Sequence, residues 1–268
     1  MAQGIVTQVA MALLLWAACT QTSRPASSQP ASAPASAPAT AQAVDPAVRR
    51  ILEALEKAGD NIRADITYEV VRRRYGDSKT RTGWLAFMKG DRKSSGKFRI
   101  TFLTLQQGTN PLIKEKLDYA FDGMWLAVAR HRIKEILYQQ LAAEGQKVEP
   151  FKLGKGPFPL PFGQPPDEML KHFEITLRKP GKKDPENTDC LRLVTRPRFE
   201  KEIPFERADM WVDRKTHLPV KFVARDRTRD RKTVLFSNIK LGAKLDKKLF
   251  TIPRPLGWKS RRERFADK

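Results

Sequence analysis

Residues 210–258 read MWVDRKTHLPVKFVARDRTRDRKTVLFSNIKLGAKLDKKLFTIPRPLGW, and this stretch decides the fold. Two short apolar runs, at 210–212 and 219–223, are separated by the polar residues 213–217. A polar connection of this length is typical of a hairpin between two antiparallel strands. The first half of the stretch therefore predicts a β-hairpin.

The second half extends the hairpin and then ends it. A polar break at 226–231 leads to a third apolar run at 233–236, which predicts a third strand paired with the second in an antiparallel meander. The pair Leu249-Phe250 follows, and then come prolines and a glycine that stop regular structure. We expect this ending to dock apolar side chains on the sheet.

The same stretch resembles the C-terminal half of the LolA-like family. The resemblance rests on D-x-x-x-x-L-P-V from Asp213, F-x-N-I from Phe236, and L-D-x-x-L-F-x-I-P-x-P-x-G-W from Leu245. A Y-x-x-D-G pair in residues 119–123 is similar to the pair in the middle of the family's sheet. Members are periplasmic carriers of lipoproteins, with relatives that act as lipid-anchored receptors or envelope-stress sensors. The resemblance implies an incomplete antiparallel barrel around a hydrophobic cavity that receives acyl chains.

The N-terminus predicts export to the periplasm. Residues 5–18 are an apolar run too short to span a bilayer and of the right length for a signal-peptide core, although no Lys or Arg precedes it. Residues 1–19 are therefore interpreted as a signal peptide. It ends in small residues and Cys19, as bacterial lipoprotein signals do, but Trp16 departs from that pattern. Two alternatives stay open: lipidation of Cys19, which would tether the protein to a membrane, or an ordinary signal peptide cut nearby.

Composition divides the rest of the chain. Residues 20–44 repeat Ala, Ser and Pro without aromatic mass, which is typical of a disordered linker. Residues 45–258 have the length of one domain, and residues 259–268 are expected as a basic C-terminal tail. The only cysteine outside the leader, Cys190, is interpreted as a small core residue.

The domain opens with a predicted helix, because Asp45-Pro46 is a good helix start and Gly59 a suitable stop. Residues 133–149 fit either a strand or a short helix. We expect a mainly β (α+β) domain: one antiparallel sheet of about ten strands, curled into an open half-barrel. Outside the meander, apolar runs predict strands at 62–75, 82–88, 97–105, 118–124, 125–128, 174–177 and 191–195.

Residues 150–173 are rich in Phe, Pro and Gly and predict a short helix only from Asp167 to Phe173. The family resemblance implies a helical lid here, over the hydrophobic cavity; an ordinary loop that packs its phenylalanines into the core is the alternative. The family's carriers also hold the lid shut with an arginine before the third strand. Arg92 in KGDRKSSGKF is the matching position, without the family's Arg-Pro context.

No pattern in the chain predicts catalysis, a cofactor or a metal site. His131, His172 and His217 have no acidic or cysteine partner at metal-ligand spacing, and the last two are expected at the surface. Serine and glycine form no hydrolase or phosphate-binding motif. The sequence indicates a non-enzymatic protein.

Charge is the strongest compositional signal. The formal net charge is +21, and Arg24 is the only charged residue before Asp45, so residues 45–268 carry +21 − 1 = +20. Such a charge favours anionic partners. An exported protein meets anionic membrane surfaces and does not meet nucleic acid, so we expect the membrane surface.

Together these patterns favour a monomeric periplasmic binder of acyl chains, from lipoproteins or phospholipid, served by cognate donor and acceptor proteins. The alternatives are an interaction or stress-sensor module with the same fold, or a membrane-tethered receptor of the LolB type. An ordinary core would use the same aromatic residues as a ligand cavity. The predicted cavity and lid residues are Trp84, Phe87, Phe98, Phe102, Trp125, Phe158, Phe162, Met169, Trp211 and Phe222.

Overall fold

The computed structural model describes residues 44–58, 61–91, 94–143, 145–146, 164–179 and 181–264. The predicted leader, the linker up to Ala43, Cys19 and Arg92 lie outside these ranges, as do Phe158 and Phe162. The helices and strands are α1 (Pro46–Lys57), β1 (Asn61–Arg72), β2 (Asp77–Met88), β3 (Lys97–Gln107), β4 (Ile113–Phe121), β5 (Trp125–Arg130), β6 (Glu135–Gln140), α2 (Pro166–His172), β7 (Phe173–Arg178), β8 (Thr188–Thr195), β9 (Arg207–Asp213), β10 (Pro219–Arg225), β11 (Arg231–Leu241) and β12 (Lys259–Glu263). Short 3-10 turns lie at Arg73–Tyr75 (η1), His131–Ile133 (η2), Pro197–Phe199 (η3) and Lys247–Phe250 (η4).

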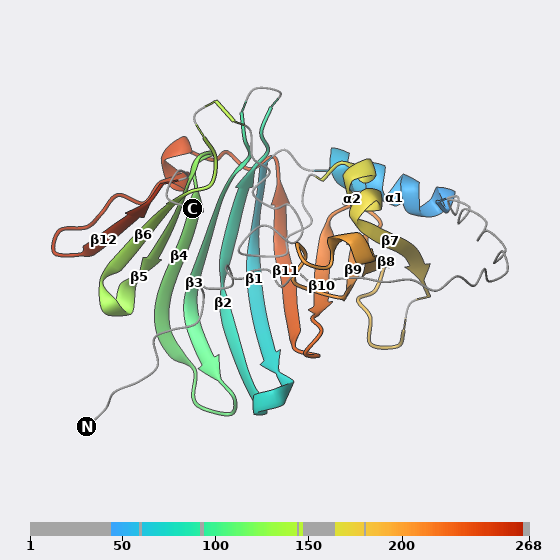
Figure 1. The fold of residues 1–268 in the computed structure, drawn as a ribbon, viewed down its shortest axis with the longest axis horizontal. Coiled ribbons are helices and arrows are strands. Elements are labelled where there is room, and N and C mark those ends of the chain that lie inside the picture. Colours follow the sequence, from blue (N-terminus) through green and yellow to red (C-terminus); the bar gives the residue numbers. More distant parts are fainter. Residues whose placement is uncertain are drawn as a thin grey trace, which may run out of the picture. The chain divides into compact units, whose positions relative to one another are not determined.

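The strands form one open sheet in the order β12-β6-β5-β4-β3-β2-β1-β11-β10-β9-β8-β7 (Figure 1). This confirms the mainly β, α+β class and the open half-barrel. The meander predicted from residues 210–236 is β9, β10 and β11, and the undecided residues 133–149 contain the strand β6. The sequence predicted about ten strands, whereas the sheet has twelve among the described residues.

The additional strand at the sheet's edge corrects a second expectation. Residues 259–263, expected in a basic tail, form β12 and pair in parallel with β6, so the sheet is mixed and not purely antiparallel. Its sequence KSRRE has no apolar residue and its side chains are mostly exposed. An edge strand of this kind is held by backbone hydrogen bonds. Since these bonds do not require apolar side chains, the sequence of the strand shows no alternation of apolar and polar residues.

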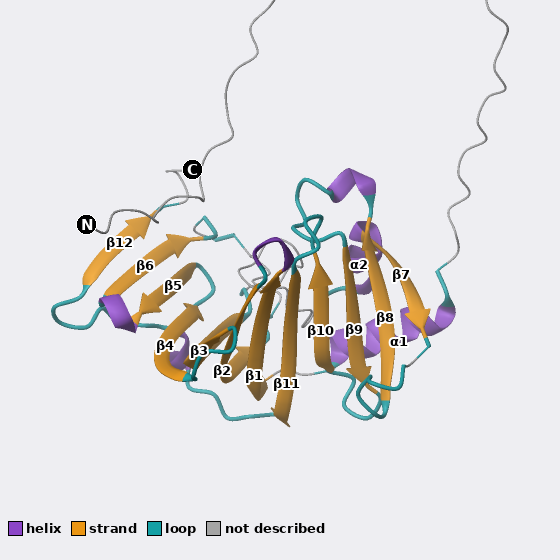
Figure 2. Cartoon of the chain, turned by 90° about the horizontal axis from the view of Figure 1, so that it is seen from below, coloured by secondary structure: helices purple, strands orange, loops and turns teal. Residues whose placement is uncertain are grey.

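Helix α1 begins as predicted. The Asp45 carboxylate accepts a hydrogen bond from the Ala47 backbone N–H, and Pro46 occupies the first turn. Val48, Leu52 and Leu55 lie on one side of the helix and are fully buried. Helix α1 contacts α2 and β7, and both helices lie beside strands β7–β10 (Figure 2).

The two sides of the sheet differ in chemistry. We call the side that carries Ile62 and Phe222 the inner face, because these side chains join the main hydrophobic core with Val48 of α1. Alternate residues of each strand lie on the opposite side, which we call the outer face. The outer face carries many charged side chains, among them Arg63 and Lys221.

Residues 242–258, which we call the C-terminal strap, cross the outer face of β3–β6. The Leu249 carbonyl accepts a hydrogen bond from Arg99 Nη1 at 3.2 Å, and the Ile252 carbonyl accepts one from Tyr138 Oη at 2.9 Å. Ile252 and Trp258 pack on a small apolar cluster of Ala127, Ala129 and Ile136. The strap thereby positions β12 on β6.

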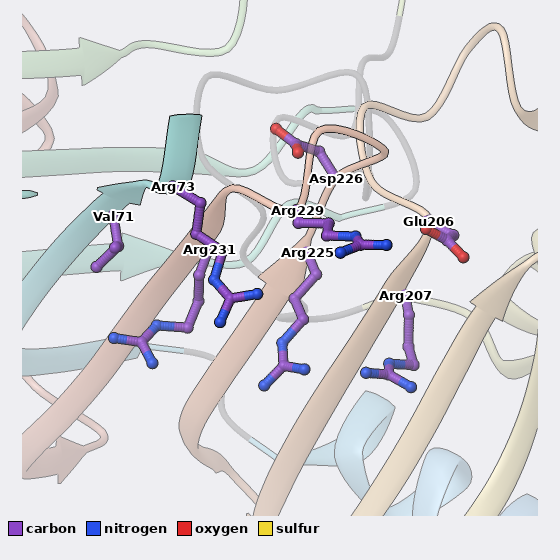
Figure 3. A pocket seen from close by; sticks show the side chains of 8 residues that line it. All are labelled: Val71, Arg73, Glu206, Arg207, Arg225, Asp226, Arg229 and Arg231. Carbon is purple, nitrogen blue, oxygen red and sulfur yellow. The ribbon is translucent and has the colours of Figure 1, made fainter. Parts of the chain in front are cut away.

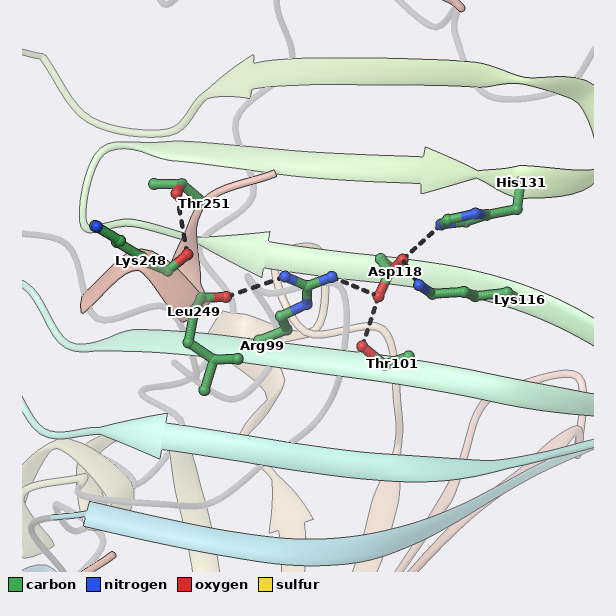
Figure 4. Close-up of polar contacts among 8 residues, drawn as sticks. All are labelled: Arg99, Thr101, Lys116, Asp118, His131, Lys248, Leu249 and Thr251. Atoms are coloured by element: carbon green, nitrogen blue, oxygen red, sulfur yellow. Dashed lines mark hydrogen bonds and ion pairs between the residues drawn. The ribbon is translucent and has the colours of Figure 1, made fainter. Parts of the chain in front are cut away.

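Beneath the strap lies a polar network centred on Asp118, whose side chain is 1% exposed (Figure 4). Its Oδ1 accepts hydrogen bonds from Thr101 Oγ1 at 2.5 Å and from Arg99 Nη2 at 3.0 Å. Its Oδ2 lies 2.7 Å from His131 Nε2 and 3.7 Å from Lys116 Nζ. Burial raises the pKa of the Asp118 carboxyl, but the hydrogen bonds with Thr101, Arg99 and His131 and the charge of Arg99 together outweigh it, and the pKa lies below its ordinary value.

Candidate ligand-binding face

The inner face of β1–β5 changes from apolar to charged along the strands. At one end, Ile62, Phe87, Phe98, Phe121 and Leu126 pair in one row across the five strands, and all five are buried. The row consists only of hydrocarbon and aromatic side chains, packed in the main core.

Further along the strands, tyrosines replace purely apolar side chains. Phe102 lies between Tyr68 and Tyr119, with ring centroids 6.1 Å and 6.4 Å away. Burial, and to a lesser extent Tyr119, raises the pKa of Tyr68 to about 12. Burial also raises the pKa of Tyr119, against the opposing effect of Arg81 and Arg130. Both phenols are therefore neutral near pH 7 and able to donate a hydrogen bond.

The gradient ends at a charged rim. Arg81 Nη2 donates to Glu115 Oε1 at 2.7 Å, and Arg132 Nη1 lies 3.6 Å from the same carboxylate. Arg81 Nη1 is buried and has no hydrogen-bond partner among the described residues. A pocket of about 290 Å³ opens at this rim. Its lining residues are Arg81, Leu105, Gln107, Glu115, Lys116, Leu117, Tyr119, Arg130, His131, Arg132 and Ile133. A larger pocket, about 440 Å³, lies elsewhere on the sheet.

The structure brings five of the predicted cavity residues together. Phe87, Phe98, Phe102, Met169 and Phe222 are buried in the main core on the inner side. Met169 comes from α2, the short helix predicted at 167–173. A ligand-binding role for these five stays a prediction.

Three predicted residues lie elsewhere. Trp84 and Trp211 lie on the outer face, Trp84 beneath the guanidinium of Arg63 at 4.6 Å, and Trp211 beneath Lys221 Nζ at 4.6 Å. Trp125 is half-buried and pairs with Gln140. It directly precedes Leu126 of the inner row in β5, so it does not belong to that row. Aromatic character alone did not distinguish the two faces.

The two tyrosines and the charged rim were not predicted from the sequence. Tyr68 follows Ile66 by two residues, and Tyr119 precedes Phe121 by two, so strand alternation places both on the inner face. Arg81 is found only through the register, which sets it opposite Tyr68. Cys190 is buried as expected, whereas His172, expected at the surface, is only 8% exposed because it packs on Phe199 with ring centroids 4.3 Å apart.

The chemistry of this face suits binding. Within the part of the chain that the structure describes, no three His, Cys, Asp or Glu side chains are arranged to hold a metal ion. No helix in that part has the length and apolar character needed to cross a membrane. Along this face, buried hydrocarbon side chains give way to neutral tyrosine hydroxyls and then to a rim that carries arginines.

No family model matches the sequence, and no curated protein does. Among solved structures, the chain is similar to an uncharacterized conserved protein from Thermus thermophilus, with a TM-score of 0.47 and 11% identity over 81% of this chain and 99% of that one. It is also similar to a chain of the MucA/MucB complex of Pseudomonas aeruginosa, with a TM-score of 0.43 and 12% identity over 77% of this chain and 61% of that one. A third neighbour is a LolA superfamily protein from Nitrosomonas europaea, with a TM-score of 0.33 and 11% identity over 76% and 97%.

Proposed function

We propose that this protein is an exported, non-enzymatic, LolA-like binder of acyl chains that carries lipoprotein or lipid between envelope membranes. The observation that supports the proposal is the polarity gradient of the inner face. Each methylene moved out of water contributes about 0.8 kcal/mol, so the apolar row provides affinity for a tail without many polar contacts. The buried, unpartnered Nη1 of Arg81 provides a donor for an anionic head group.

The first test is mass spectrometry of the full chain, exported to a bacterial periplasm and purified without detergent. The proposal requires a stoichiometric acyl-bearing molecule in the native mass spectrum. A protein that copurifies with none, and that takes up no palmitate from solution, contradicts it.

A pair of variants tests the head-group end of the face. Arg81→Gln should weaken palmitate binding roughly tenfold, the loss expected for one charge-assisted hydrogen bond, and leave the binding of hexadecanol unchanged. Arg63→Gln removes an arginine from the outer face and is the matched control. Equal effects of the two variants would contradict the assignment of the head group to Arg81, and thermal unfolding checks that both are folded.

The second candidate is a protein-interaction module, and the edge strand β7 favours it. One side of β7 pairs with β8, and β7 ends the sheet among the described residues. An extended peptide can add to such an edge through backbone hydrogen bonds. A chain purified without lipid but with a stoichiometric protein partner, lost in Thr176→Lys at this edge and kept in Ser237→Lys of the central strand β11, would favour this function.

A further inference from the structure

Three arginines form a row on the outer face, on the side of the sheet opposite the apolar core. Arg207 of β9 pairs with Arg225 of β10, and Arg225 pairs with Arg231 of β11. Their side chains extend in the same direction from neighbouring strands (Figure 3). We call Arg207, Arg225 and Arg231 the arginine row. Arg73 of η1 lies near Arg231, and Arg229 of the β10–β11 turn lies near Arg225 (Figure 3).

Acidic partners do not neutralise the arginine row. Arg231 Nη2 lies 3.1 Å from Glu69 Oε2, but no described carboxylate forms an ion pair with Arg207 or Arg225. The exposed Glu206 also lines the pocket, and its backbone N–H donates to the Arg225 carbonyl.

The two aspartates beside the arginine row, Asp226 and Asp230, accept hydrogen bonds from backbone N–H groups. Asp226 Oδ1 accepts hydrogen bonds from the backbone N–H groups of Thr228 and Asp230 and from the Thr228 hydroxyl. Asp230 Oδ1 accepts one from the Arg73 backbone N–H. These bonds fix the turn that carries Arg229 and leave the guanidinium groups available.

Like charges on directly paired residues repel each other, because such side chains stand about 5 Å apart at Cβ. The row therefore raises the energy of the empty protein, and an anion placed among the guanidinium groups lowers it. The pocket at the row encloses about 440 Å³, enough for a small polar group. Arginine's planar fork binds phosphate oxygens in a bidentate manner, and a terminal phosphate offers several such oxygens.

We propose that Arg207, Arg225 and Arg231 form a binding site for a phosphate monoester or diphosphate group. The paired strands hold the three side chains in register before the ligand arrives. This site lies on the face opposite the acyl-chain site, so it stands whether or not the protein carries lipid.

The soluble arm of the test uses pyrophosphate and isothermal titration calorimetry of the full chain. Arg225→Gln should weaken pyrophosphate binding roughly tenfold, because it removes the central guanidinium. Lys114→Gln is the matched control: it removes one exposed strand cation from β4, outside the pocket. An equal loss in both variants would mean that general charge attracts the anion, and it would overturn the proposal.

The membrane arm uses vesicles of phosphatidylcholine with either phosphatidic acid, a monoester, or phosphatidylglycerol, a diester, at about 0.15 M salt. A preference for phosphatidic acid that Arg225→Gln abolishes and Lys114→Gln keeps supports the site and identifies a lipid head group as its source. Pyrophosphate binding without that preference supports the site for a soluble phosphate. Binding of neither probe, or equal binding by Arg225→Gln, overturns the proposal.

Discussion

Asp118 is the centre of the polar network on the outer face of β3–β6. Asp118→Asn keeps the shape of the side chain but leaves the guanidinium of Arg99, which is largely buried, without its counter-charge. Removing one partner of a buried pair costs about 3–5 kcal/mol, and we expect a loss of unfolding free energy near the lower end. Denaturant unfolding at pH 7 measures it. Glu135→Gln, which breaks the exposed pair with Arg130, should cost less than about 1 kcal/mol, and equal losses would contradict the role of Asp118.

The same carboxylate predicts how stability depends on pH. The folded pKa of Asp118 is lowered, so its stabilisation is fully present above the unfolded value of about 3.9 and is lost as pH falls through the folded value. The wild-type protein should lose unfolding free energy more steeply below about pH 4 than Asp118→Asn does. Denaturant unfolding at a series of pH values measures both slopes, and parallel slopes would contradict the prediction.

Strand alternation explains what could be predicted residue by residue. Trp84 and Phe87 are an odd number of positions apart in β2, and Trp211 directly follows the buried Met210, so alternation alone separates the tryptophans from the inner face. The arginine row was not predictable in this way. Arg225 stood in a visible basic run, but its neighbour Arg207 is brought beside it only by the register of β9 with β10.

Local sequence patterns predicted some helices and strands correctly but did not predict β12. Helix α1 and the β9–β11 meander were predicted because caps, turns and apolar runs lie within a few residues of one another. Strand β12 was not, since its pairing with β6 depends on a segment more than a hundred positions earlier in the chain. The C-terminal strap helps to fix its position, because Ile252 and Trp258 pack on Ala127, Ala129 and Ile136, more than a hundred positions earlier in the chain.

The strap makes a prediction about β12. Trp258 packs on the small apolar cluster, and its ring stands edge-on to His131 at 4.8 Å between centroids. Trp258→Ala should therefore free β12 from β6, at a local cost of about 2 kcal/mol for a half-buried aromatic side chain. Limited trypsin digestion should then cleave after Lys259, Arg261 or Arg262 at lower protease concentrations than in wild type.

The matched control lies in the same strap. The Leu256 side chain is fully exposed, so Leu256→Ala should leave the cleavage pattern unchanged. If β12 of Trp258→Ala resists trypsin as well as wild type does, backbone pairing with β6 is sufficient without the strap.

For the whole molecule, the net charge of +21 predicts attraction to anionic membranes that salt weakens. Phosphatidylglycerol vesicles should retain the protein at low ionic strength and release it near 1 M NaCl, where the screening length falls to about 3 Å. Phosphatidylcholine vesicles should not retain it. Sedimentation with vesicles measures this, and retention that is independent of salt would indicate apolar insertion in place of surface attraction.

The strand order also determines how this protein reaches its fold. Strands β1 to β6 pair with their neighbours in sequence, and so do β7 to β11, so each half can form through short loop closures. The halves meet along the ladder in which Ile66 of β1 pairs with Phe236 of β11, and β12 adds a second long-range ladder with β6. Both ladders join segments far apart in the chain, so we expect their closure to be slow in folding. Until the β1–β11 ladder forms, each of these strands presents an unpaired edge, and we expect misfolding or capture by a chaperone to begin at these edges.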